Sequence, residues 1–329
     1  MSELTIISPP QPVIDTSKNL VNPECFDIRQ EHFPNEITFY GPGLKPHKTS
    51  EFSGSLREFV SISVTGSNCA LNCEHCNTKM LDKMLDLPSF DGSLFDMAVS
   101  LKEKGAKGLL ISGGSNAMNQ VPLLPHIADM KRIRSELDLL IRVHPGLPDE
   151  ATCQALSEVD IDGVMLDIIG DQETISEVYH LNATPADYDK VLERLDRYGI
   201  PAIPHIVIGH YFGKMNGEWA ALEMIKKYSP KILVLVILLP LTGTGMEGVK
   251  PPSINEIGDF FETARRALPQ SPILLGCARP LGALKIDIDQ LAINAGLNGI
   301  AFPSEGIISY AKEKGLESKF INACCGVTW

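Results

Sequence analysis

Residues 61–76 read SISVTGSNCALNCEHC and join an alternating apolar segment to three cysteines, Cys69, Cys73 and Cys76. The alternation predicts a β-strand that runs directly into a thiol-rich loop. Thiolates with this close spacing suit a [4Fe–4S] cluster, whose usual ligands are cysteines. Because this loop offers only three cysteines for the four irons of such a cluster, one iron would be left open for chemistry.

The alternative for this loop is a zinc site or a set of buried thiols. Structural zinc sites usually combine one close cysteine pair with a second pair further along the chain. The only other close pair in this sequence is Cys324 and Cys325, which are adjacent. The spacing therefore favours an iron–sulfur cluster over zinc.

The pattern Cys-x3-Cys-x2-Cys, with His75 before the last cysteine and a first strand before the loop, resembles the radical S-adenosylmethionine (SAM) superfamily. The resemblance implies that Cys69, Cys73 and Cys76 hold a [4Fe–4S] cluster and that SAM binds its open iron. It also implies reductive cleavage of SAM to a 5′-deoxyadenosyl radical, with electrons from a flavodoxin-type or ferredoxin-type donor.

Composition places the chain among globular proteins, with 329 residues, 44% of them hydrophobic and 21% charged. A net charge of −12 argues against nucleic acid or an anionic membrane as the main partner, since both need a basic surface. The N-terminus lacks the pattern of a secretory signal, and the apolar run at 232–239 is far shorter than the roughly 20 residues that span a bilayer. We expect a cytoplasmic protein whose eight cysteines stay reduced.

From Phe59 onward, short apolar segments alternate with amphipathic helical patterns, which is typical of repeated βα units in a parallel sheet. Eight units predict an α/β fold, a (β/α)8 TIM-type barrel that is closed and carries its site at the carboxyl ends of the strands. The predicted strands lie near 59–64, 108–112, 139–143, 163–168, 201–208, 232–239, 272–277 and 298–302. We expect three parts: an N-terminal extension (1–57) with one short strand at 37–40, the radical SAM barrel (58–303), and a C-terminal helix with a cysteine-containing tail (304–329).

Several helices have clear local signals. Thr184 and Pro185 predict the start of a helix, and Gly199 predicts its end. Ser253 and Glu256 form the pattern of a capping box, and Gly105 is placed to end an earlier helix.

Candidate SAM-binding residues lie where the predicted strands end. In the resembling family a glycine-rich stretch after the second strand approaches the SAM methionine, which here implies Ser112, Gly113 and Gly114, although Ser115 stands where the family commonly has Glu. Asp167 ends strand four, where its carboxylate could accept hydrogen bonds from the SAM ribose. The resemblance further implies Asn182 as a SAM contact and the stretch around Ile208 beside adenine. Asp167 and Asn182 could instead be helix caps or loop-ordering side chains.

Three histidines, His144, His205 and His210, also fall near this rim. A lone histidine is more often a satisfied structural residue, so we assign no catalytic residue beyond the cluster and SAM. Cys153 lies in a predicted helix and reads as a small buried hydrophobe.

The remaining four cysteines are candidates for a second, auxiliary cluster. Cys277 follows the seventh predicted strand, Cys25 lies on the extension, and Cys324 and Cys325 lie in the tail. If both arms fold over the barrel mouth, these thiols could converge on one [4Fe–4S] cluster. The alternative is that they are free thiols.

Taken together, these features resemble the biotin and lipoyl synthase group, and within it a subunit of the two-protein lipoyl synthase. That resemblance implies radical sulfur insertion into unactivated C–H bonds of an octanoyl chain on a carrier protein, with a second radical SAM subunit as partner. Two alternatives stay open: another biotin-synthase-like radical SAM enzyme (a mutase, a lyase or a small-molecule sulfur-inserting enzyme), and a non-catalytic iron–sulfur carrier.

Overall fold

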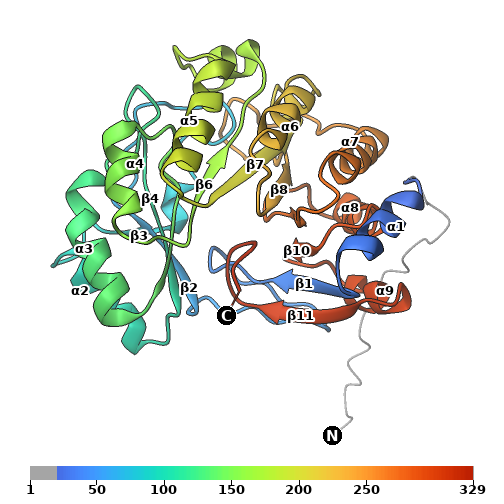
Figure 1. Ribbon diagram of the computed structural model, residues 1–329, viewed down its shortest axis with the longest axis horizontal. Helices are drawn as coiled ribbons and strands as arrows, with labels where there is room; N and C mark the ends of the chain where they lie inside the picture. Colours follow the sequence, from blue (N-terminus) through green and yellow to red (C-terminus); the bar gives the residue numbers. More distant parts are fainter. Residues whose placement is uncertain (1–20, 329) are drawn as a thin grey trace, which may run out of the picture.

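The computed structural model describes residues 21–328. Its strands form one parallel sheet in the order β11-β1-β10-β9-β8-β7-β6-β5-β4-β2-β3. Figure 1 shows this sheet curving around a central space, with most helices on its outer side. The strands are β1 Glu36–Tyr40, β2 Phe59–Ser63, β3 Leu85–Asp86, β4 Gly108–Ser112, β5 Leu140–Val143, β6 Gly163–Asp167, β7 Ala202–Ile208, β8 Leu233–Ile237, β9 Ile273–Leu275, β10 Gly299–Ala301 and β11 Glu317–Ile321. The chain therefore has a parallel α/β half-barrel, which confirms the predicted parallel sheet of repeated βα units.

The α-helices are α1 Glu24–His32, α2 Leu94–Glu103, α3 Ile127–Arg132, α4 Glu150–Ser157, α5 Pro185–Arg197, α6 Glu218–Lys226, α7 Ile254–Ala267, α8 Ala283–Asn294 and α9 Ile307–Glu313. Short 3-10 turns lie at Leu81–Lys83 and Leu124–His126, and π-helical turns at Ile133–Leu137 and Thr174–Val178. The predicted starts of α5 and α7 are confirmed, because each begins with a reciprocal capping box, Thr184 with Asp187 and Ser253 with Glu256. No helix within 21–328 is long and apolar enough to cross a lipid bilayer.

Side-chain alternation gives the sheet two buried faces. Outward residues such as Ile111 and Leu166 pack under the helices in the larger core. Inward residues such as Phe59, Leu110 and Met165 form a second, smaller core inside the half-barrel. Because parallel strands all point the same way, their carboxyl ends form one rim.

The eight strands predicted from the sequence are confirmed as β2 and β4 to β10, but the predicted closure of the barrel is wrong. The hydrogen-bonded sheet ends at β11 and β3, so β2 does not pair with the far side. β1 extends the sheet instead, because Thr38 is in register with Gly299 of β10, and β11 adds outside it. The predicted extension and tail therefore both contribute strands to the sheet.

Side chains bridge the opening between β11 and β2. Asn322, which follows β11, accepts a hydrogen bond from the Ser55 backbone N–H (3.0 Å) and donates one to Glu58 (2.7 Å). The tail then continues inward, where Arg142 donates to the Gly326 carbonyl (2.9 Å). The tail thus fills the inner side of the gap, as its course in Figure 1 indicates.

A buried ion pair fixes the rim after β9 and β10. The Arg279 Nε donates to Asp289 (2.7 Å), and these side chains are 1% and 0% exposed. Asp289 also accepts from Lys285 (3.0 Å) and from the Ser304 backbone N–H (2.8 Å). Burial lowers the pKa of Lys285 to about 8. A single carboxylate therefore compensates two cations at this position.

Replacing that carboxylate tests how strongly the rim depends on it. Asp289→Asn leaves both cations buried without an anion, and we expect it to lower the free energy of unfolding by about 3–5 kcal/mol. Glu158→Gln is the matched control, because it breaks an exposed pair with Lys131 and should change stability by about 1 kcal/mol or less. Urea denaturation of both variants measures the difference, and equal losses would contradict this account.

Candidate functional site

The cysteine loop follows β2 at the carboxyl rim and is fastened to three other rim segments by backbone hydrogen bonds. The Ala70 N–H donates to the Ser115 carbonyl after β4 (2.8 Å), and the Glu74 N–H donates to Val178 (2.9 Å). The Met246 N–H donates to the Glu74 carbonyl (3.2 Å). The loop is thus positioned by segments that lie far apart in the sequence.

The three cysteines of this loop are free thiols. The Cys69 sulfur accepts a hydrogen bond from the Ser115 backbone N–H (3.4 Å). Ligand atoms of Cys73, His75 and Cys76 all lie within 4.8 Å of one another. A hydrogen bond from the Cys73 thiol to Cys76 raises the pKa of Cys73 and lowers that of Cys76. Soft, partly buried sulfur ligands of this kind suit an iron–sulfur cluster.

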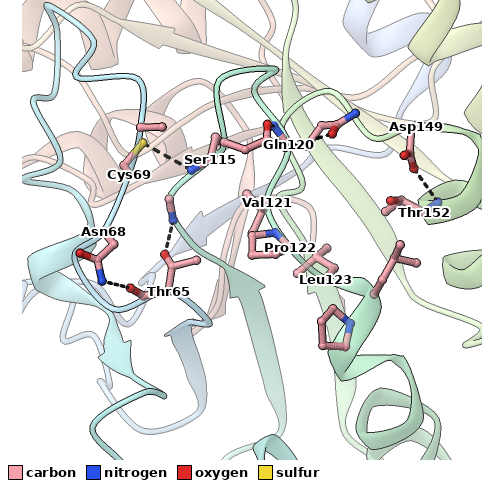
Figure 2. A pocket seen from close by; sticks show the side chains of 15 residues that line it. Thr65, Asn68, Cys69, Ser115, Gln120, Val121, Pro122, Leu123, Asp149 and Thr152 are labelled. Carbon is pink, nitrogen blue, oxygen red and sulfur yellow. Dashed lines mark hydrogen bonds between the residues drawn. The ribbon is translucent and has the colours of Figure 1, made fainter.

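The glycine-rich stretch after β4 packs directly against the cysteine loop. The Gly114 N–H donates to the Thr65 hydroxyl (2.6 Å), and a Cβ on Gly114 would overlap the backbone carbonyl of Asn68. The Ser112 hydroxyl donates to the His144 carbonyl (2.8 Å). Figure 2 shows Thr65, Asn68, Cys69 and Ser115 around this contact. Glycine is required at position 114 because a side chain would push the two segments apart.

A cleft of about 580 Å³ borders Cys69 on its outer side. Thr65, Asn68, Cys69 and Ser115 form one wall, and the segment 120–125 forms the other. Figure 2 shows Val121, Pro122 and Leu123 on that second wall, with Asp149 and Thr152 beyond them. Cys69 therefore faces an open cleft.

Asp167 lies at the end of β6 on the inward side, half-buried, beside Tyr179, whose hydroxyl donates to it (3.4 Å). The Tyr179 ring lies 5.1 Å from the ring of His210, which in turn lies 4.7 Å from that of His75. Burial lowers the pKa of His205 to about 4 and that of His210 to about 3. Both imidazoles are therefore neutral near pH 7. The His205 Nδ1 is hydrogen-bonded to the Ile203 carbonyl (2.9 Å), whereas neither ring nitrogen of His210 has a hydrogen-bond partner within residues 21–328.

Two further residues that we predicted to contact SAM, Asn182 and Ile208, do not place their side chains beside Asp167 on the inward side of the rim. Asn182 is exposed in the turn before α5. The Ile208 side chain is fully buried in the core between the sheet and the helices, and its carbonyl accepts from the Leu238 N–H (2.9 Å). Any role of Ile208 beside a cofactor would therefore fall to its backbone.

The four candidate cysteines of the auxiliary site separate into two places. Cys277, Cys324 and Cys325 belong to the inner core of the half-barrel. Cys25 lies on α1 in the outer core and is surrounded by groups of α7 such as Arg266 and Glu262. The expectation that Cys25 joins the other three is therefore wrong, because α1 packs on the opposite side of the sheet.

Sequence reasoning missed Arg142. This residue interrupts the apolar strand β5 at an inward position, is 6% exposed, and contacts the tail through Gly326. A charged residue inside a buried parallel strand was the available signal, since such strands normally read as continuous apolar runs.

Comparisons with known proteins agree with this geometry. Residues 63–228 match the family model for the radical SAM superfamily, and the chain belongs to that superfamily. It is similar to the biotin synthase of Chlorobaculum parvum, with 26% identity over 257 residues and 70% of each chain covered. The family implies a [4Fe–4S] cluster and SAM, and the free thiols of Cys69, Cys73 and Cys76 fit that cluster.

Solved structures share the fold at low identity. Methylornithine synthase superposes with a TM-score of 0.62 at 14% identity, covering 93% of this chain and 90% of that one. Streptococcus suis SuiB bound to S-adenosylmethionine gives 0.52 at 12% identity, covering 74% and 57%. SuiB bound to its precursor peptide SuiA gives 0.50 at 12% identity, covering 80% and 52%.

The contact at Gly114 can be tested by adding one methyl group. Gly114→Ala should displace the cysteine loop and reduce the iron that this loop binds after anaerobic reconstitution to less than about half, because the new Cβ overlaps a backbone atom. Gly54→Ala is the matched control, since its Cβ would meet only ordinary contacts at 3.5 Å and beyond. Iron content and the cluster signal in electron paramagnetic resonance (EPR) measure the effect. Equal iron in both variants would show that the loop does not need this approach.

Proposed function

We propose that this radical SAM enzyme inserts sulfur into unactivated C–H bonds of an octanoyl chain carried on a protein lysine, as a subunit of a two-protein lipoyl synthase. The observation that carries the proposal is a second group of free thiols, Cys277, Cys324 and Cys325, in the inner core. A sulfur-inserting enzyme needs such a group beside the radical site, whereas a mutase or lyase does not. The similarity to biotin synthases, which is 26% over 257 residues, supports the sulfur-inserting class.

We assign the radical site to the rim. Cys69, Cys73 and Cys76 would hold the cluster, Ser112, Gly113 and Gly114 would face SAM, and Asp167, Asn182 and the Ile208 backbone would contact its nucleoside. When bound, cluster and SAM supply a 5′-deoxyadenosyl radical that abstracts hydrogen from carbon. The protein's part is placement and exclusion of water. Gly114 brings the β4 loop against the cysteine loop, and the Ser115 N–H donates to the Cys69 sulfur.

We assign an auxiliary [4Fe–4S] cluster, as the sulfur donor, to Cys277 with one or both tail cysteines. Cys324 and Cys325 are 6% and 5% exposed. Adjacent cysteines rarely bind one cluster equally well, so we expect one of the two to matter more. Cys25 is left out of this set.

The proposed partners are an octanoylated carrier protein, a second radical SAM subunit and an electron donor of the flavodoxin or ferredoxin type. SuiB, which shares the fold, is solved with its precursor peptide SuiA. A peptide-borne lysine is therefore a reasonable form of substrate for this architecture. Sulfur insertion into a small molecule is the second candidate, because the curated relatives are biotin synthases.

Iron counting tests the two-cluster assignment. After anaerobic reconstitution we expect about eight irons per chain, and about four in the Cys277→Ala or the double Cys324→Ala, Cys325→Ala variant. Cys153→Ala is the matched control, because that thiol lies on the buried side of α4 in the outer core and its removal should leave the iron count unchanged. About four irons in the wild type would refute the auxiliary cluster.

Turnover tests the chemistry. With SAM and dithionite we expect 5′-deoxyadenosine, and with an octanoyl-lysyl peptide plus the partner subunit a product heavier by inserted sulfur in mass spectrometry. Cys69→Ala should abolish both products, because the radical cluster loses a ligand. Absence of 5′-deoxyadenosine from the reconstituted wild type would instead favour a non-catalytic iron–sulfur carrier.

A further inference from the structure

Arg142 is buried inside the half-barrel without a compensating anion. Its side chain points inward from β5 and is 6% exposed. One nitrogen, Nη2, donates to the Gly326 carbonyl in the tail (2.9 Å). Its other two nitrogens, Nε and Nη1, have no hydrogen-bond partner within residues 21–328. A guanidinium buried in this way is unfavourable by several kcal/mol unless an anion accompanies it.

Asp162, a carboxylate within electrostatic reach of Arg142, is already engaged elsewhere. Asp162 accepts hydrogen bonds from Arg134 (3.3 Å) and from the Ile141 backbone N–H (2.7 Å). Other groups in electrostatic reach of Arg142 are the thiols of Cys324 and Cys325, the Tyr40 hydroxyl and the neutral imidazole of His205. Thiols that bind a metal do so as thiolates. Burial raises the pKa of both tail thiols, so they provide the missing negative charge only as thiolates bound to a metal.

Cations also face the third thiol of this group. Arg279 and Lys45 both lie within electrostatic reach of Cys277. Arg279 is compensated by Asp289, whereas Lys45 lies over the Phe302 ring (4.8 Å) and forms no ion pair in the described part of the chain. Three cations, Arg142, Arg279 and Lys45, therefore lie near the three thiols. Of the two cations that lack an ion-pair partner in the described residues, Arg142 and Lys45, Arg142 is the more deeply buried.

We propose that Arg142 is the positioning residue of the auxiliary site. Its positive charge and its Nε and Nη1 donors serve thiolates of Cys324 and Cys325. Its Nη2 holds the tail through the Gly326 carbonyl. The proposal rests on the proposed function, since it needs a thiolate-bound iron–sulfur group at Cys277 and the tail. A positive charge beside such a group stabilises its more negative, reduced form. Arg142 therefore raises the reduction potential of the auxiliary cluster in addition to retaining it.

Reconstituted full-length variants test this role without measuring turnover. Arg142→Met removes the charge at similar length, Arg142→Gln keeps an amide donor for the Gly326 carbonyl, and Arg142→Lys keeps the charge. We expect the two neutral variants either to fall from about eight to about four irons per chain, or to keep the iron while the reduced fraction of the auxiliary cluster at a fixed ambient potential falls at least about tenfold. Arg142→Lys should stay close to wild type.

Arg132→Met is the matched control, because Arg132 is an exposed arginine paired with Glu136 on the outer surface. Iron and sulfide counts with EPR-monitored redox titration give the readouts, and circular dichroism confirms folding. If the Met variant does not fold, the Gln variant decides. About eight irons and a wild-type reduction potential in a folded Met or Gln variant would overturn the role of Arg142 but leave the auxiliary cluster standing. About four irons in the wild type would overturn the auxiliary cluster and this role together.

Discussion

The contact between the cysteine loop and the loop after β4 is the constraint on which the rim depends. Ala70 and Ser115 are joined by a backbone hydrogen bond of 2.8 Å, and the Ser115 N–H donates to the Cys69 sulfur at 3.4 Å. This approach is possible because Gly114 has no side chain. The parallel order of β2 and β4 brings the two loops to the same edge. One sterically required glycine therefore links the direction of the strands to the position of the thiols.

The inner face of the half-barrel is divided between two environments. Toward the cysteine loop it carries the imidazoles of His205 and His210, which are neutral near pH 7, and the carboxylate of Asp167. Around the tail it carries Arg142 and three thiols within an otherwise apolar core. A low-dielectric interior strengthens electrostatic interactions, so a charge placed there has large effects on its neighbours. This second region is a candidate site because the tail brings the thiols of Cys324 and Cys325 into it.

Local patterns predicted most of the fold, and long-range contacts account for what they missed. Eight strands and the capping boxes at Thr184 and Ser253 follow from residues close in sequence. The pairing of β1 with β10 joins residues more than 250 positions apart, and no periodicity encodes it. The rim cysteines were predictable because their spacing is itself the signal. The grouping of Cys277 with the tail, and the exclusion of Cys25, depend on which side of the sheet each segment packs.

The inner thiols could be inert buried cysteines or metal ligands. The two interpretations differ in whether the charge of Arg142 has a counter-ion. Cys153 illustrates the inert case, because it packs in the outer apolar core. Burial raises the pKa of Cys153 to about 11 and that of Cys324 to about 12, so the thiol pKa does not separate the two readings. If Cys324 and Cys325 were equally inert, Arg142 would remain a buried cation with two unused donors. Arg29 on α1 is also buried with two unpartnered nitrogens, but Arg142 differs from it because the thiols of Cys324 and Cys325 lie within its electrostatic reach. Arg142 is therefore better explained by an anion at the thiols than by packing alone.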